Sequence, residues 1–180
     1  MRYLVDAIIL IEAKNRYYAF DIAPGFWEWL DRAHRQGVTC SIDSVRDELL
    51  RGDDELTGWA AAHRDFFRPL DQRTTTHFGA LTAWVTAQGY RPSAINAFTG
   101  KDADFQLIAV ALEHGFTVAT YERPKPNARK RVLIPDVCVA MGVPTVDTFD
   151  MMRATGASLH LASAPFDDGA LVAPTLPGLE

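Results

Sequence analysis

Short apolar runs alternate with longer amphipathic stretches along this chain, and the first run, RYLVD at 2–6, ends in an acid. Short apolar runs predict buried strands, and apolar residues that recur every three or four positions predict helices. Strands that alternate with helices favour a layered α/β fold. We therefore predict an α/β protein built on a parallel sheet.

The pattern assigns most of the chain to particular elements. The predicted strands are 2–6, 38–41 and 116–120, with shorter ones at 132–134 and 144–146. The predicted helices are 24–36, 54–68, 74–89 and 102–114, a short one from Asp43 or Ser44 to Leu50, and one that begins near Pro135. After Gly156 the periodicity fades into an Ala-, Pro- and Gly-rich stretch. We therefore predict one domain over 1–155 and a C-terminal tail over 156–180.

Length and cysteine content exclude several classes of protein. A chain of 180 residues can bury a sufficient core without a structural metal or disulfides. Its two cysteines, Cys40 and Cys138, can form neither a disulfide framework nor a thiolate metal cage. The apolar run between Asp6 and Glu12 is too short for a signal sequence or a membrane span. We expect a soluble, cytoplasmic protein with no membrane partner.

Acidic residues occur where the predicted strands and helices would bring them together. Ligand sites in parallel sheets form beyond the carboxyl ends of the strands. Asp6 ends the first predicted strand, and Glu122 closely follows a later one. Glu48 lies near the apolar face of a short helix, and Asp104 shares the inward stripe of the helix at 102–114. We therefore expect these four carboxylates at one edge of the sheet.

The chemistry of such a cluster points to a divalent metal. Acids at helix starts are usually caps or solvated, and this is the simpler interpretation of Asp43, Asp47 and Asp102. Asp6 and Asp104 instead interrupt apolar patterns, and a buried carboxylate is costly unless it is paired, protonated or bound to metal. Carboxylate oxygens suit Mg²⁺ or Mn²⁺. Several at one sheet edge fit metal-assisted hydrolysis of a phosphodiester.

Five sequence motifs follow one another along the chain in this order: YLVDAIILIEAKNRYY, SIDSVRDEL, KDADFQLIAVALEHG, FTVATYE and VLIPDVC. Together they resemble the PIN-domain family over about residues 1–155, and most of all an uncharacterised PIN-like group with an IEAKNRYY-type N-terminus. The resemblance implies a three-layer α/β/α fold with a central, mainly parallel sheet. It also implies a metal-dependent endoribonuclease, in many members a VapC-like toxin of a toxin–antitoxin pair.

The resemblance also implies roles for particular residues and partners. The catalytic and metal-binding residues that it implies are Asp6, Glu48, Asp104 and Glu122, with Mg²⁺ or Mn²⁺ as cofactor. Asp102 and Asp136 are additional candidate ligands, and Thr120 matches the supporting hydroxyl that usually precedes the last acid. The implied partners are an RNA substrate, a second copy of the chain in a homodimer and, for a toxin, an antitoxin protein.

Ile8 departs from the family pattern. PIN-like proteins usually carry a polar residue two places after the first aspartate, whereas isoleucine cannot hydrogen-bond a carboxylate or a phosphate. We therefore expect weaker orientation of the metal ligands by their neighbours. Natural divergence and an introduced inactivating change both remain open as its origin. The alternative function is a catalytically impaired PIN-like module that binds RNA or a protein partner.

One dense basic stretch directly follows Glu122. It consists of Arg123, Lys125, Arg129, Lys130 and Arg131. A cationic loop beside a metal centre can hold the backbone of single-stranded RNA, although a solvated basic loop is an equally simple interpretation. The net charge of −5 argues against a protein that coats nucleic acid. It does not exclude an RNA substrate, because metal ions bound by a local acidic cluster reverse the charge that a phosphate meets.

Other enzyme classes fit the sequence less well. No G-x-G-x-x-G follows the first predicted strand, so a dinucleotide-binding oxidoreductase is excluded. A phosphatase of the haloacid-dehalogenase type needs a second aspartate where Ile8 stands. The five histidines are scattered without metal-ligand spacing, and they receive no predicted role.

Overall fold

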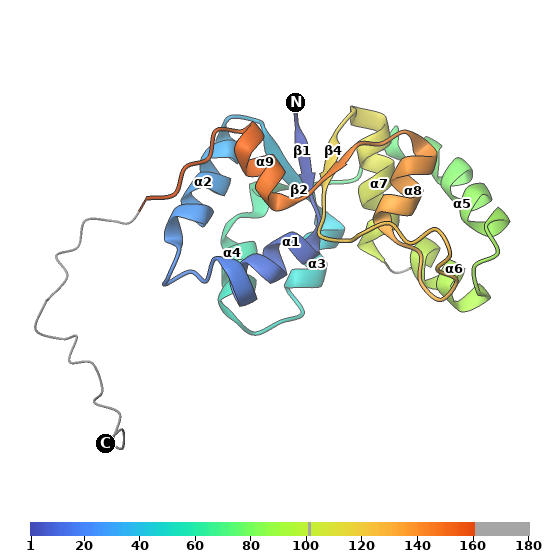
Figure 1. Cartoon of the computed structure of the whole chain (residues 1–180), viewed down its shortest axis with the longest axis horizontal. Coiled ribbons are helices and arrows are strands. Elements are labelled where there is room, and N and C mark those ends of the chain that lie inside the picture. Colours follow the sequence, from blue (N-terminus) through green and yellow to red (C-terminus); the bar gives the residue numbers. More distant parts are fainter. Residues whose placement is uncertain (101, 161–180) are drawn as a thin grey trace, which may run out of the picture.

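The sheet consists of five parallel strands in the order β3-β2-β1-β4-β5. The computed structural model describes residues 1–100 and 102–160. The strands are β1 (Tyr3–Val5), β2 (Thr39–Ile42), β3 (Phe67–Arg68), β4 (Thr117–Ala119) and β5 (Thr145–Val146). Helices cover both faces of this sheet, with α2, α4 and α9 on one side in Figure 1 and α5 to α8 on the other. The predicted three-layer α/β/α fold with a parallel sheet is confirmed.

The helices follow the strands in alternation. The first four are α1 (Ala7–Glu12), α2 (Pro24–Arg35), α3 (Asp43–Leu49) and α4 (Glu55–Ala62). The other five are α5 (Phe78–Ala87), α6 (Pro92–Gly100), α7 (Ala103–His114), α8 (Ile134–Met141) and α9 (Thr148–Ala154). A π-helical turn η1 (Ala13–Tyr17) extends α1, and two 3₁₀ turns are η2 (Arg64–Phe66) and η3 (Thr74–His77).

The middle of the sheet is the core of the protein. All three residues of β1 and all three of β4 are buried, and the two strands pair in register with Val5 opposite Ala119. The helix α7 is also largely buried, and it ends at Gly115, whose φ of +66° is a left-handed conformation that suits glycine. Parallel strands all run in one direction, so the residues that follow β1, β2 and β4 lie at one edge of the sheet.

Three predicted elements differ from the structure. The helix expected over 54–68 ends at Ala62, and β3 occupies Phe67–Arg68 instead. The helix expected over 74–89 begins with the 3₁₀ turn η3, because the Asp71 side chain accepts hydrogen bonds from the Thr74 backbone and hydroxyl. The strand expected at 132–134 is wrong, since Ile134 already begins α8. The helix α6 was not expected.

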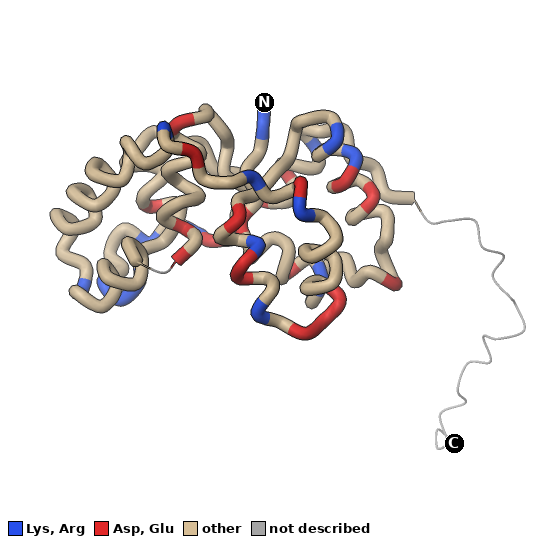
Figure 2. The backbone as a smooth tube through the Cα atoms, turned by 180° about the vertical axis from the view of Figure 1, so that it is seen from behind, with Lys and Arg blue, Asp and Glu red and all other residues tan. Residues whose placement is uncertain are grey.

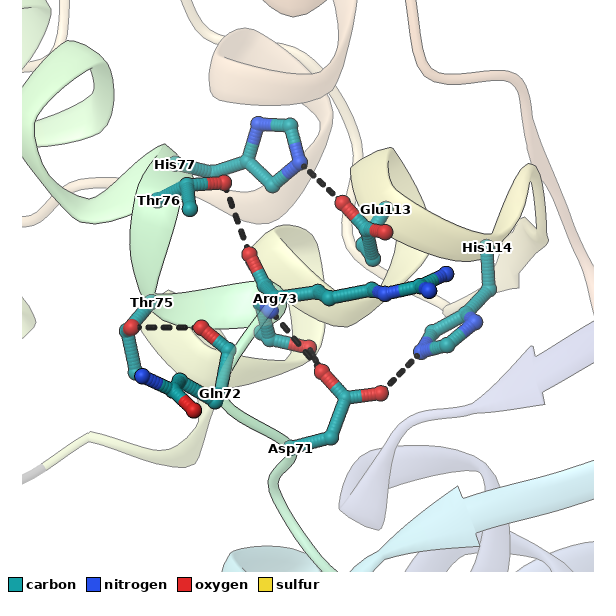
Figure 3. A network of polar contacts seen from close by, with 9 residues as sticks. Asp71, Gln72, Arg73, Thr75, Thr76, His77, Glu113 and His114 are labelled. Atoms are coloured by element: carbon teal, nitrogen blue, oxygen red, sulfur yellow. Dashed lines mark hydrogen bonds and ion pairs between the residues drawn. The ribbon is translucent and has the colours of Figure 1, made fainter.

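Two histidine–carboxylate pairs join η3 and the segment before it to the end of α7 (Figure 3). His77 Nε2 lies 3.0 Å from Glu113 Oε2, and His114 Nε2 lies 3.0 Å from Asp71 Oδ2. His77 and His114 therefore connect α7 with η3 and the segment before it.

The predicted tail over 156–180 falls outside the described residues from 161 onward, and the domain boundary at 155 stays a prediction. Among residues 1–100 and 102–160, no helix is both long and apolar enough to cross a membrane.

Candidate active site

Asp6 is a buried carboxylate at the end of the central strand. It directly follows β1, its backbone N–H donates to Ala119 O, and only 5% of the residue is exposed. Its Oδ2 accepts a hydrogen bond of 2.8 Å from the hydroxyl of Thr120, which directly follows the neighbouring strand β4. The pairing of β1 with β4 therefore brings together a carboxylate and a hydroxyl that are 114 residues apart in sequence.

Thr120 connects Asp6 with Glu122. While its hydroxyl donates to Asp6, the same oxygen accepts a hydrogen bond of 3.1 Å from the Glu122 backbone N–H. Glu122 Oε2 accepts a hydrogen bond of 2.8 Å from the backbone N–H of Ile134, at the start of α8. Both carboxylates are thus held by groups of the surrounding fold.

Glu48 and Asp104 lie near Asp6 and Glu122, and each comes from a different helix. Glu48 lies near the end of α3, and Asp104 lies in the first turn of α7. The Ser44 hydroxyl of α3 donates to the Gln106 side chain of α7, which holds these helices side by side. The structure therefore places all four carboxylates that the sequence analysis selected in the wall of one pocket of about 480 Å³. They are Asp6, Glu48, Asp104 and Glu122.

Burial is the main cause of the raised pKa values of three carboxylates in this acidic pocket. Burial, together with the charges of Glu122 and Glu48, raises the pKa of Asp6 to about 7 against the lowering effect of the Thr120 hydrogen bond. Burial and the charges of Asp6 and Glu122 raise the pKa of Asp104 to about 8. Burial also raises the pKa of Glu48. Around neutral pH the pocket therefore favours binding a proton or a cation.

Arg131 is a basic side chain in the wall of the acidic pocket. Its Nη2 lies 2.8 Å from Glu122 Oε1 and 3.9 Å from Asp104 Oδ2, while 67% of the side chain remains exposed. Within the described residues, no three His, Cys, Asp or Glu side chains form a group that could hold a metal ion as they stand. Arg131 and the Ile134 N–H together engage both carboxylate oxygens of Glu122.

The donor set nevertheless fits Mg²⁺ or Mn²⁺. Both ions prefer carboxylate oxygens and need only one or two of them when water and a phosphate complete the coordination. Buried carboxylates with raised pKa values are stabilised by a cation in their midst. Acidic positions from several separate segments gather near the middle of the molecule, with basic positions between them (Figure 2).

The two additional candidate ligands lie apart from each other. Asp102 precedes α7 and lines a smaller cavity of about 250 Å³ together with Glu48 and Asp104, and its charge contributes to their raised pKa values. Asp136 does not line the acidic pocket. It lies in the first turn of α8, where its Oδ1 accepts a hydrogen bond of 2.9 Å from the Lys125 backbone N–H.

The basic stretch lies on the connection between β4 and α8, and its side chains make different contacts. Arg131 enters the acidic pocket. Arg123 pairs with Asp147 at 3.5 Å, and Arg129 donates to the carbonyls of Pro126 and Ala128 within its own loop. Lys130 is exposed. The loop is therefore partly an ordered structural element and partly a free cationic surface.

The first helix and its extension contribute further residues to the pocket wall, and of these the sequence analysis considered Ile8 but gave Glu12 and Arg16 no role. Ile8, Glu12 and Arg16 all line the acidic pocket, and Glu12 pairs with Arg16 at 3.1 Å. The four-residue spacing from Ile8 to Glu12 and from Glu12 to Arg16 places them on one helical face, and this spacing was the available signal. Two tyrosines, Tyr17 and Tyr121, complete the wall with ring centroids 5.7 Å apart.

Comparison with known protein families gives one match, to a family described as a domain of unknown function, DUF4411. The match covers residues 3–159. The chain belongs to the DUF4411 family. All residues of the acidic pocket, from Asp6 to Arg131, lie within the DUF4411 match. No curated protein matches the chain significantly.

Proposed function

We propose that this DUF4411 protein is a divalent-metal-dependent endoribonuclease with a PIN-like active site. One observation carries the proposal: four carboxylates from four separate segments of the chain line one pocket at the carboxyl edge of a parallel sheet. These are Asp6, Glu48, Asp104 and Glu122. Acids that serve only to interact with solvent would not be expected to line one buried pocket together. Burial of several carboxylates in one place costs free energy, which bound cations would offset.

The proposed reaction is hydrolysis of a phosphodiester bond in RNA. Mg²⁺ or Mn²⁺, when bound by the four carboxylates, would stabilise the negative charge that develops on the phosphate oxygens. The chain's own contribution is orientation: the Thr120 hydroxyl fixes one oxygen of Asp6, and the Ile134 N–H fixes one oxygen of Glu122. Such support commonly changes metal affinity or activity by about 10–100-fold.

The surroundings of the acidic pocket suit a single nucleic acid strand. Tyr17 and Tyr121 offer aromatic faces beside the carboxylates, and half of the Tyr17 residue is exposed. Lys125 and Lys130 are exposed on the loop that follows Glu122. Aromatic side chains that stack bases, next to cations that follow the phosphates, are the usual features of single-strand binding.

The proposed biological role is that of a toxin with an antitoxin partner. It rests on the PIN-like sequence motifs together with the proposed nuclease activity. Expression of the wild-type chain should then arrest bacterial growth, whereas Asp104→Asn at the same protein level should not. Equal growth with both chains would contradict the toxin role and leave the nuclease activity to be judged by cleavage in vitro.

A second function is favoured by Ile8 and Arg131. Ile8 lines the pocket with an apolar side chain where PIN-like proteins usually have a polar one, and Arg131 pairs with a carboxylate that a metal would need. Both features favour a catalytically impaired module that binds RNA or a protein partner.

Cleavage assays separate the two functions. Purified wild-type protein, Asp104→Asn and the control Asp150→Asn are incubated with fluorescently labelled single-stranded RNA and Mn²⁺. The nuclease function predicts cleavage by wild type and by Asp150→Asn, whose exposed carboxylate lies on α9, and loss of cleavage in Asp104→Asn. RNA binding by wild type without any metal-dependent cleavage would support the impaired module instead.

A further inference from the structure

Three aromatic side chains form a partly exposed platform at the edge of the acidic pocket. Tyr17 belongs to the π-helical turn η1, Tyr18 directly follows this turn, and Phe149 lies in the first turn of α9. The ring centroid of Phe149 lies 6.2 Å from that of Tyr17 and 6.5 Å from that of Tyr18. Tyr17 is 49% exposed and Phe149 is 40% exposed. This aromatic platform therefore joins two elements that are distant in sequence.

The π-helical turn places Tyr17 beside the carboxylates. In this turn the Tyr18 N–H donates to the Ala13 carbonyl at 2.6 Å. Turns of this kind are rare and are frequently found at functional sites. The Lys14 ammonium group pairs with Asp54 at 2.8 Å and fixes the turn to the segment before α4. Tyr17 lines the acidic pocket, so the aromatic platform begins in the wall of that pocket.

The aromatic platform is anchored to the core. Tyr18 stacks on the fully buried Phe26, with centroids 4.3 Å apart and an angle of 3° between the rings. The Tyr18 carbonyl also accepts a hydrogen bond of 2.8 Å from the Trp27 indole N–H. Rings that are already held in place lose little conformational entropy when a ligand binds. A contiguous apolar patch that stays exposed commonly marks an interaction site.

The charges around the aromatic platform favour a polyanion. The side chain of Arg16, in the wall of the acidic pocket, is 69% exposed, and that of Arg123 is 74% exposed. Two acids near the start of α9 are each paired with an arginine: Asp147 with Arg123 at 3.5 Å, and Asp150 with Arg153 at 3.0 Å. Exposed aromatic rings next to cations are the usual features of a surface that binds single-stranded nucleic acid.

We propose that the aromatic platform stacks one base of the RNA, in the nucleotide next to the phosphate held at the carboxylates. Tyr17 both lines the acidic pocket and pairs with Phe149, so a single strand can occupy the two places at once. Stacking accepts every base, because every base has a π face. The aromatic platform therefore positions the strand and selects little for sequence. The proposal rests on the proposed nuclease function for its RNA ligand.

RNA binding by the full chain tests this role. The fluorescence anisotropy of a labelled single strand of about 12 uridines is followed, with Ca²⁺ in place of Mn²⁺. We expect Tyr17→Leu and Phe149→Leu each to weaken binding by about 10-fold, because leucine keeps apolar volume and removes the flat face. Wild-type affinity in both leucine variants, or no RNA binding by the wild-type chain, would overturn the proposal.

Three further variants are controls. Tyr17→Phe and Phe149→Tyr each keep an aromatic ring, and both should bind RNA within about twofold of wild type. Val139→Ala shortens an exposed apolar side chain of α8 that does not line the acidic pocket, and it should bind as wild type does. Losses in the ring-retaining variants as large as those in the leucine variants would contradict stacking.

A strand with a single base tests stacking with the wild-type chain itself. A strand of about 12 abasic residues is compared with one that carries a central uracil. We expect the uracil to raise the affinity of wild type by about 10-fold and that of Tyr17→Leu by less than about twofold. With 5-iodouracil as the single base, irradiation should link the strand to Tyr17 or Phe149, as identified by mass spectrometry. An equal gain in both chains, or links only to residues outside the aromatic platform, would contradict the assignment.

Cleavage and self-association separate this proposal from its alternatives. Ring-dependent RNA binding without metal-dependent cleavage would overturn the nuclease function and support the aromatic platform. Cleavage with the same KM in wild type, Tyr17→Leu and Phe149→Leu would overturn the platform and leave the nuclease function standing. Self-association that is lost in Tyr17→Leu, with unchanged RNA affinity, would assign these rings to a protein contact and overturn the RNA ligand. Analytical ultracentrifugation measures the self-association.

Discussion

The hydroxyl of Thr120 donates a 2.8 Å hydrogen bond to Asp6, across the junction of the two central strands. Because Asp6 is buried, this bond fixes the orientation of a carboxylate that solvent barely reaches. The same hydroxyl accepts the Glu122 N–H, so one small side chain supports two of the four carboxylates.

Thr120→Val removes this hydroxyl and keeps the shape of the side chain. We expect the free energy of unfolding to fall by about 1–3 kcal/mol, since a buried carboxylate loses its donor. Metal-dependent cleavage should fall by about 10–100-fold. Thr120→Ser retains the hydroxyl and should stay near wild type in urea unfolding and in activity. Stability and cleavage near wild type in Thr120→Val would show that the hydroxyl is not needed.

Arg131→Gln removes the cation that pairs with Glu122 and approaches Asp104. If Arg131 competes with a metal for these carboxylates, the variant should bind Mn²⁺ more tightly, by roughly 3–10-fold for a largely exposed charge. Arg123→Gln, which loses only the pair with Asp147, should leave Mn²⁺ affinity unchanged. Calorimetric titration measures both affinities. Weaker Mn²⁺ binding in Arg131→Gln would contradict the competition.

The stability of the metal-free protein should decrease as pH rises from about 5 to about 8. Asp6 and Asp104 have folded-state pKa values of about 7 and about 8, above the ordinary value of 3.8, so the folded state binds more protons in this range. A folded state that holds extra protons loses stability as pH rises, here by on the order of 3 kcal/mol. Urea unfolding at several pH values measures it, and Asp104→Asn should flatten the profile. A stability that increases from pH 5 to pH 8 would be inconsistent with these pKa values.

Asp71, which does not line the acidic pocket, should contribute stability of the opposite pH dependence through the contacts drawn in Figure 3. Hydrogen bonds from the Thr74 backbone and hydroxyl, and the nearby His114, lower its pKa. A lowered pKa stabilises the fold above the ordinary value of 3.8, and this contribution is lost as pH falls below it. Asp71→Ala should therefore lower stability at pH 6, lose this difference near pH 2, and leave Mn²⁺ affinity unchanged. An equal effect at both pH values would rule out an ionic contribution.

Ile8→Asn tests whether the apolar residue in the pocket limits catalysis. An asparagine at this position could hydrogen-bond a carboxylate or a phosphate, and we expect Mn²⁺-dependent RNA cleavage to rise by about 10-fold or more. Ile11→Asn is the matched control, since Ile11 also lines the acidic pocket from the same helix. Cleavage that stays at the wild-type level in Ile8→Asn would show that Ile8 does not restrict activity.

The sequence was sufficient to predict those site residues whose position follows from a strand end or a helix face. Asp6 ends an apolar run, and Asp104 shares a stripe with buried residues of α7, so the topology of a parallel sheet brings them together. Thr120 and Glu122 follow a second buried strand in the same way. The pocket that contains the four carboxylates agrees with that expectation.

Features that depend on loops and long-range contacts could not be predicted in this way. Arg131 was assigned to the RNA surface together with its basic neighbours, and only the path of the loop shows that it turns back to Glu122. Asp136 is bound by the Lys125 N–H of the same loop and lines a different cavity. The strand β3 has two residues, too few for a pattern, and its pairing with β2 defines it.

The most direct test of the metal site is calorimetric titration of the wild-type chain and Asp104→Asn with Mn²⁺, together with thermal unfolding. We expect wild type to bind Mn²⁺, with a Tm that rises by roughly 5–10 °C at a hundred times the Kd. Asp104→Asn should lose this binding and, without metal, be at least as stable as wild type, because one of the repelling buried carboxylates is gone. Absence of Mn²⁺ binding by the wild-type chain, or undiminished binding by Asp104→Asn, would contradict the proposed metal site.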